Sequence, residues 1–205
     1  MDGSGDKKKE NQVRTFTVPF ALGEIKDNIT ITTNIPSKPS KEEIINQALK
    51  FHSQGNIAEA TKYYQSLIDE GCKDHRVFCN YGVILKNIGK LLDAELSYRK
   101  AIKINPNNAP AHNNLGRILT DLSKLNEAEA SIRKAIKFKP DFAEAHYNLG
   151  IILRPLGKLK EAKKSYRKAI EINPNFTDAH LNLGTIMKDL GKLQEAELSL
   201  RKAIE

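Results

Sequence analysis

The sequence predicts an all-α fold built as an α-solenoid, and three observations carry the prediction. The stretch that begins at Ala145 recurs at Ala179 and Ala111, with a looser copy at Val77, so the starts are 34 residues apart. Each copy has the apolar spacing of two helices, with Gly or Ser between them, and the complete copies end in a Pro or Asn-rich turn. A helical pattern with a period of roughly 20–50 residues is typical of a solenoid, in which each unit packs only on its neighbours.

Residues 1–40 differ in composition from the rest of the chain. They begin with a Lys-rich polar stretch and end in the linker sequence Pro36-Ser37-Lys38-Pro39. Two short runs of β-branched and aromatic residues, 15–18 and 29–32, have the alternation of strands. Because a two-stranded hairpin alone is marginal in water, we expect a flexible or partly extended N-terminal segment. A further hypothesis is that this segment occupies a binding groove of the array.

Residues 41–205 form the predicted array. Its units are 41–74, 75–108, 109–142, 143–176 and a shortened, incomplete unit, 177–205. In each unit we expect a first helix over positions 2–14 and a second over positions 17–30. The turn falls at position 15, which holds Gly55, Gly89, Ser123, Gly157 and Gly191. Pro155 lies inside a first helix, where it removes a backbone hydrogen bond, so we expect a kink or an early end there.

Small residues at fixed positions predict close packing of the helices. Position 8 holds Ala48, Gly82, Gly116, Gly150 and Gly184, and position 20 is alanine in all five units. Larger side chains at position 24 are expected to fill the space opposite them. On the exposed faces of the second helices, pairs such as Glu95–Arg99 and Glu129–Arg133 have the spacing of surface ion pairs.

These features resemble the tetratricopeptide repeat (TPR), a 34-residue helix–turn–helix unit with small residues at positions 8, 20 and 27. The resemblance covers residues 41–205 and departs from the pattern at Leu67 and Cys72, where a small residue and proline are usual. It implies a right-handed α-solenoid of stacked TPR helical hairpins whose first helices line a concave groove. The near-identical units are similar to the TPR arrays attached to O-linked N-acetylglucosamine transferases and other bacterial transferases.

The candidate binding residues begin with an asparagine at position 6 of every unit: Asn46, Asn80, Asn114, Asn148 and Asn182. A primary amide has two donor hydrogens and an acceptor oxygen, so it can hold both polar groups of a peptide unit. The row resembles the asparagine ladder of the O-linked N-acetylglucosamine transferase array. The alternative is that these asparagines only connect neighbouring helices.

Basic residues at positions 9 and 12 are the second set of candidates: Lys86, Arg117, Arg154 and Lys188. They give the predicted groove points that can bind an acidic side chain or a C-terminal carboxylate. Acidic residues occur near them, so the wall is mixed in charge. The alternative is that each cation is simply a solvated charge on a helix face.

Composition and motifs exclude several classes of function. The formal net charge is +8, with the basic excess in the middle three units, which favours acidic partners. No apolar run reaches the length of a membrane span and the N-terminus lacks a signal peptide, so we expect a cytoplasmic protein that does not bind membranes. His112, His146 and His180 are one unit apart, too far to converge on one zinc ion. No catalytic motif is present, and we predict no enzyme activity, no metal and no cofactor.

The function predicted from these residues is a protein–protein interaction scaffold that binds an extended peptide or partner protein in the groove. The alternative is the substrate-targeting TPR arm of a larger glycosyltransferase or sulfotransferase-type enzyme. Nucleic-acid binding is disfavoured because stacking aromatics are scarce on the groove. No polar capping helix follows the last unit, which predicts either a longer chain or self-association through the uncapped C-terminal repeat.

Overall fold

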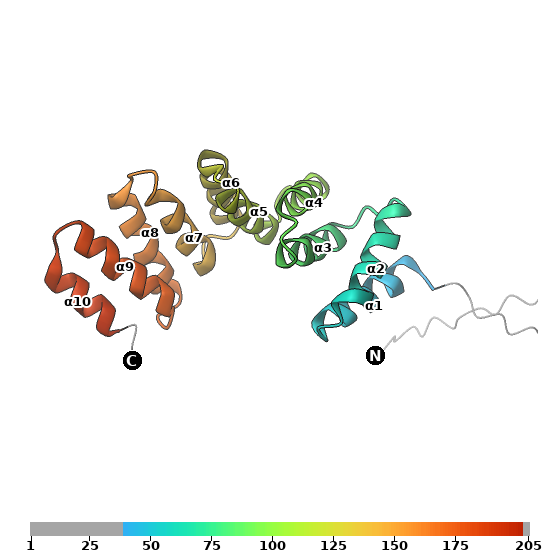
Figure 1. Ribbon diagram of the computed structural model, residues 1–205, viewed down its shortest axis with the longest axis horizontal. Helices are drawn as coiled ribbons and strands as arrows, with labels where there is room; N and C mark the ends of the chain where they lie inside the picture. The colour runs from blue at the N-terminus through green and yellow to red at the C-terminus, as the bar shows by residue number, and fades with distance from the viewer. Residues whose placement is uncertain (1–38, 203–205) are drawn as a thin grey trace, which may run out of the picture. The chain divides into compact units, whose positions relative to one another are not determined.

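The computed structural model describes residues 39–202, so the strand-like runs 15–18 and 29–32 lie outside the described residues. The described chain is helical and consists of five consecutive hairpins (Figure 1). Their helices are α1 (Lys41–Ser53), α2 (Ile57–Asp69), α3 (His75–Asn87), α4 (Leu91–Ile104), α5 (Ala109–Asp121), α6 (Leu125–Phe138), α7 (Ala143–Leu153), α8 (Leu159–Ile172), α9 (Thr177–Asp189) and α10 (Leu193–Arg201). Odd-numbered helices are the first helices of the units. Each packs on its own second helix, and each second helix packs on the first helix of the next unit. The α-solenoid predicted from the repeat is confirmed.

The turn inside each hairpin has the same geometry in all five units. The residue at position 15 has a positive φ, between 71° and 77° at the four glycines and 59° at Ser123. The N–H of the following residue donates to the carbonyl five residues earlier, for example from Lys90 to Leu85 at 2.9 Å. This is a Schellman motif, which satisfies the last carbonyls of a helix and favours glycine because a Cβ is disfavoured at positive φ. Ser123 adopts the same conformation without that advantage.

The helices begin and end close to the predicted positions, with one residue of difference for the first helices. These cover positions 1–13 of the unit instead of 2–14. The helix α7 ends earlier, at Leu153, because Pro155 has no N–H to donate to the carbonyl of Ile151. The Schellman bond is kept there, from the N–H of Lys158 to the carbonyl of Leu153 at 3.0 Å. The prediction of an early end is confirmed, and the hairpin that follows keeps its register.

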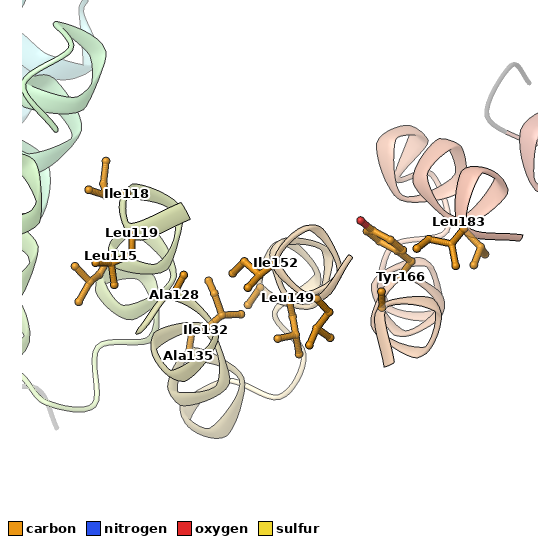
Figure 2. Close-up of a cluster of buried hydrophobic side chains, with 14 of the residues drawn as sticks. Leu115, Ile118, Leu119, Ala128, Ile132, Ala135, Leu149, Ile152, Tyr166 and Leu183 are labelled. Carbon is orange, nitrogen blue, oxygen red and sulfur yellow. The ribbon is translucent and has the colours of Figure 1, made fainter. Parts of the chain in front are cut away.

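The core lies between the two helices of each hairpin and continues from unit to unit. One cluster extends from Leu85 in α3 to Ala196 in α10, and Figure 2 shows Leu149 and Ile152 of α7 turned toward Ile132 of α6. The glycine at position 8 permits the closest approach: a Cβ at Gly150 would lie 2.5 Å from the ring of Tyr166. Such a separation is well inside van der Waals contact, so glycine at this position lets the tyrosine ring fill the hairpin.

A ladder of ion pairs connects the second helices. Arg133 of α6 contacts Glu129 of the same helix and Glu161 of α8, each at 2.8 Å. Lys158, just before α8, contacts Glu129 at 2.8 Å, and the side chain of Glu129 is only 13% exposed. The same set occurs one unit earlier, around the carboxylate of Glu95. Both predicted pairs within one helix are present, but their glutamates are largely buried and not exposed, because cations of the next unit also cover them.

Candidate functional site

The candidate site is the surface formed by positions 2, 5, 6, 9, 12 and 13 of the first helices, which we call the first-helix face. The structure places all nine candidate residues on this face or at its edge. The asparagines occupy the middle of α1, α3, α5, α7 and α9. Of the cations, Lys86, Arg117 and Lys188 lie in the C-terminal halves of α3, α5 and α9, and Arg154 directly follows α7. The nine residues do not form one uniform site, because their hydrogen-bond and ion-pair partners differ.

Three of the five asparagines donate hydrogen bonds within the chain. Asn148 Nδ2 donates to Asn113 Oδ1 at 2.9 Å, and Asn182 Nδ2 donates to the Tyr147 hydroxyl at 3.2 Å. Asn182 also donates to the carbonyl of Asp178 at 2.9 Å, and Asn80 donates to the carbonyl of Arg76 at 2.9 Å. Connection of neighbouring helices is therefore one role of this position in units 4 and 5.

The side-chain amides of Asn46 and Asn114 have no hydrogen-bond partner among residues 39–202, and Asn46 is exposed while Asn114 is half-buried. Whether an asparagine finds a partner in the preceding unit depends on the residue at position 5 of that unit. In units 3 and 4 this position holds Asn113 and Tyr147, whose oxygens can accept a hydrogen bond. Before Asn114 it holds Cys79, a weak acceptor that already receives Asn108 Nδ2 at 3.8 Å.

The sequence analysis did not identify Asn113 and Tyr147 as the partners of Asn148 and Asn182. Tyr147 packs against Phe176 and Tyr166, with ring centroids 4.8 Å and 5.8 Å away. Burial raises the pKa of its hydroxyl, and the Asp178 carboxylate adds to that effect. Asn113 and Tyr147 both lie at position 5 of a unit, and both have a side-chain oxygen that can accept from the asparagine of the next unit. That pattern in the sequence could have identified them.

The cations of the first-helix face also divide into two kinds. Arg154 contacts Asp189 of the next unit at 3.0 Å. Arg76, at position 2, contacts Asp74 at 2.7 Å and Glu42 at 2.8 Å. Lys86, Arg117 and Lys188 have no ion-pair partner within the described part of the chain.

Lys86 is half-buried, and its surroundings oppose its charge. Burial lowers its pKa, and the nearby Arg117 guanidinium lowers it further, while the Asp121 carboxylate acts in the opposite direction. Lys188 occupies the same repeat position in α9 but is exposed. Lys86 and Lys188 therefore differ in environment although they share a repeat position.

The histidines at position 4 hold the loops between units. The Nε2 atoms of His112, His146 and His180 each lie 2.9 Å from the carbonyl oxygen of a proline six residues before them in the chain. A carbonyl only accepts, so each Nε2 carries the hydrogen, whatever the charge of the ring. Among residues 39–202, no group of three or more His, Cys, Asp or Glu side chains is placed to hold a metal ion. The hydrogen bonds to the proline carbonyls give these histidines a structural role in packing the loops between units.

Stacked two-helix hairpins with an exposed row of first helices define a class of protein-interaction scaffolds, the α-solenoids. Models described as Tetratricopeptide repeat match residues 75–108, 143–176, and both 97–130 and 165–197. A model described as TPR repeat matches residues 116–154. The chain belongs to the tetratricopeptide repeat family, and the resemblance inferred from the sequence is confirmed.

Solved structures share the fold of the array. A structure of MamA is 24% identical with a TM-score of 0.70 and covers 77% of this chain and 92% of that one. YrrB, described as a TPR protein with an unusual peptide-binding site, is 22% identical with a TM-score of 0.68, covering 80% and 85%. The pilF protein of Pseudomonas aeruginosa is 19% identical with a TM-score of 0.72, covering 80% and 75%. Comparison with curated proteins finds no match.

The array is thus a protein-interaction scaffold of the tetratricopeptide type. None of the helices within residues 39–202 is long and apolar enough to cross a bilayer. At identities below 25% the similar structures define the fold, so the binding residues have to be argued from this chain.

Proposed function

We propose that the chain binds an extended segment of a partner protein along the first-helix face, with the asparagines at position 6 holding the partner's backbone. The observation that carries the proposal is the amide of Asn114, which is half-buried in the middle of the array and has no hydrogen-bond partner among residues 39–202. An amide that makes no hydrogen bond to residues 39–202 can donate to and accept from a bound peptide unit in place of water. The peptide-binding site named for YrrB supports this use of the fold.

The spacing of the units supports an extended ligand. Packed helices lie about 8–10 Å apart, and a strand advances about 3.3 Å per residue. One asparagine can therefore meet roughly every third residue of the bound segment. Asn80 and Asn148 each use one amide hydrogen inside the chain, so their second hydrogen and their oxygen remain for a partner.

Site-specific photocrosslinking tests which face binds the partner. A photoreactive amino acid replaces Lys188 on the first-helix face in one variant and Lys164, exposed on α8, in the matched control. Extracts of cells that express the protein are irradiated with each variant. We expect a crosslinked partner from position 188 and not from position 164. Crosslinking from position 164 alone would place the interface on the second helices and refute the proposal.

Substitution of the asparagines tests their role in that crosslink. Asn114→Ala removes an amide that has no partner within residues 39–202, so we expect no loss of stability and about fivefold weaker partner binding. Asn148→Ala instead removes the bond to Asn113 and is expected to lower stability as well. Unchanged binding by a folded Asn114→Ala variant would contradict backbone recognition by this residue.

The cytoplasmic location and the role as an arm of a larger transferase, both expected from the sequence, stay predictions. A cytoplasmic location agrees with the free thiols of Cys72 and Cys79, which suit a reducing compartment. The role as an arm of a larger transferase is tested by assaying crosslinked partners for glycosylation or sulfation by the protein that carries the array. A partner that is bound but never modified would favour the plain scaffold.

A further inference from the structure

A second surface, on the helix α4, carries large apolar side chains that face solvent. Leu92 is 68% exposed and Leu96 is 55% exposed, and Ile88, in the turn before the helix, is 55% exposed. Leu92 and Leu96 are four residues apart, so they lie one above the other on the same face of α4. Single apolar residues are ordinary on a protein surface, whereas neighbouring ones are typical of interaction sites.

The other units show that the hairpin does not need leucine at these two places. Leu92 and Leu96 occupy positions 18 and 22 of unit 2. In α2, α6 and α8 the same positions are exposed and hold Ala58 and Lys62, Asn126 and Ala130, and Lys160 and Lys164. Those helices pack on their first helices as α4 does. The leucines are therefore not explained by packing within the array, and their burial against a partner would be favourable.

The exposed side of α4 continues from the leucines into two cations. Arg99 and Lys103 follow Leu96 by three and seven residues, so they lie on the same side of the helix. Arg99 is paired with Glu95 at 2.8 Å and with Glu127 at 2.7 Å. Lys103 is exposed and has no ion pair among residues 39–202. We call these four residues the α4 row: Leu92, Leu96, Arg99 and Lys103.

The charges that border the α4 row leave its surroundings positive. Asp93 and Lys100 lie beside the row, seven residues apart, and both are exposed. The Nζ atom of Lys100 lies 5.7 Å from the centre of the Phe78 ring. Lys90, directly before α4, is exposed as well. One aspartate thus stands against these two lysines and Lys103, and a positive border of this kind complements an acidic partner.

A second copy of the chain does not complement the α4 row. Two parallel rows side by side would bring Lys103 against Lys103, and like charges across an interface are unfavourable. Antiparallel rows with a common centre would bring Leu92 against Lys103 and Leu96 against Arg99. A register that brings the leucines together buries two of them from each copy, far less than the roughly 800 Å² per partner of a stable interface.

A bilayer surface does not complement the row either. A helix that lies in a membrane interface needs an apolar face about 100° wide or more. Here Asp93 and Lys100 border the leucines, and the ion pair of Arg99 and Glu127 follows within one turn. The apolar face is therefore narrow, and a narrow row fits the groove between the side chains of another helix.

We propose that the α4 row docks a helix of a partner protein, whose contacting face carries two large apolar side chains and an acidic residue further along. The row has residues spaced by four, three and four, which is the spacing of a seam between two packed helices. The apolar side chains pack on Leu92 and Leu96, and the acidic residue pairs with Lys103. This site goes beyond the proposed function, because it lies on a second helix and takes a helical partner.

A displayed peptide library tests the class of partner. Its members are Ala- and Gln-rich peptides of about 18 residues, long enough to form a helix. On one face, two central positions and the positions on either side of them vary among Leu, Gln, Glu and Lys. Selection is run in parallel on the full chain and on the variant Leu92→Lys/Leu96→Lys, which gives α4 the residues that α8 has at these positions. Circular dichroism checks that the variant is folded.

We expect helices with leucine at both central positions and glutamate beside them to be enriched on the wild type over the variant. The most enriched helix is then synthesised with a fluorescent label and titrated in anisotropy measurements. It should bind the wild type about a hundredfold more tightly than the variant, roughly tenfold for each buried leucine.

A charge reversal tests the pairing with Lys103. In the variant Lys103→Glu the labelled helix should bind about fivefold more weakly, and selection should favour lysine over glutamate. The matched control is Lys137→Glu, which changes the same repeat position on α6 and the same net charge. It should leave both the affinity and the preference for glutamate unchanged.

Equal enrichment on the wild type and on the leucine variant would overturn the docking site. A preference for glutamate that Lys103→Glu leaves unchanged would overturn the acidic partner. If sedimentation equilibrium showed a wild-type dimer that the leucine variant lost, a second copy would occupy the row and the inference would be wrong. Binding of phosphatidylserine vesicles to the wild type and not to this variant would overturn it in favour of a membrane. The first-helix face takes no part in these measurements, so the proposed function is tested separately.

Discussion

The ion pairs around Glu129 predict how much the free energy of unfolding falls when its charge is removed. Glu129 accepts Arg133 Nε at 2.8 Å and Lys158 Nζ at 2.8 Å, and thereby joins α6 to the start of α8. The substitution Glu129→Gln keeps the shape of the side chain and removes its charge. Two cations then face a neutral amide, and the contact between units 3 and 4 weakens.

The magnitude depends on how exposed the partners are. A hydrogen bond to a charged group contributes about 1.5–3 kcal/mol when it is protected from water. Arg133 and Lys158 are 48% and 43% exposed, so solvent screening reduces each pair toward the range of surface ion pairs, about 0.2–1 kcal/mol. We expect Glu129→Gln to lower the free energy of unfolding by about 1–2 kcal/mol. The matched control Glu161→Gln, whose side chain is 53% exposed and contacts Arg133 alone, should cost less than about 0.5 kcal/mol.

The assay is urea unfolding followed by circular dichroism at several pH values. Hydrogen bonds from Lys158 and Arg133 lower the pKa of Glu129 below its ordinary value of 4.5. Its contribution to stability is therefore complete above about pH 4.5 and is lost as pH falls through the lowered folded-state pKa. The difference between the wild type and Glu129→Gln should shrink in the same range. A difference equal to that of Glu161→Gln, or one that does not shrink as pH falls well below 4.5 while the chain stays folded, would refute the ladder as the cause.

Three further predictions concern single positions. Ser123→Gly should raise the free energy of unfolding by about 0.5–1 kcal/mol in urea titrations, because φ is 59° there and a residue with a Cβ is strained at positive φ. A lower free energy of unfolding in the variant would contradict this backbone strain. Pro155→Asp should lengthen α7 and slow amide exchange at residues 154–156, seen by NMR, since a donor for the Ile151 carbonyl returns; unchanged exchange would assign the early end to another cause. Burial lowers the pKa of His112 below its ordinary 6.5, so stability should fall as pH drops below about 6.5, and His112→Phe should flatten that dependence; an equal slope in the variant would exclude this histidine.

Much of the fold was predictable because its determinants are local. Glycine or serine at position 15, proline after the second helix and apolar spacing within each unit depend on residues close in the chain, and five copies of the same pattern remove ambiguity. Even the early end of α7 follows from Pro155, since a missing N–H acts within one helical turn. The one-residue shift of the first helices reflects end positions that local patterns define weakly.

The sequence predicted which helix face carries the candidate residues, but not which of their polar groups remain free to bind a partner. Five asparagines recur at position 6, yet their partners differ because position 5 of the preceding unit differs. Asn148 finds an acceptor in Asn113, 35 residues earlier, whereas the same step back from Asn114 meets Cys79. The pattern within one unit does not show which residue of the preceding unit meets each asparagine.

The sequence by itself determined the repeat, the hairpins and the row of asparagines, since these follow from periodicity and backbone chemistry within each unit. The tertiary structure decided which polar and charged groups are already satisfied. It covers the Glu129 carboxylate with a lysine of the next unit, pairs Arg154 with Asp189, and leaves Lys86 half-buried without an ion pair among residues 39–202. Hydrogen bonds and ion pairs form between whichever groups the stacking brings within about 3 Å, and that distance is set across units.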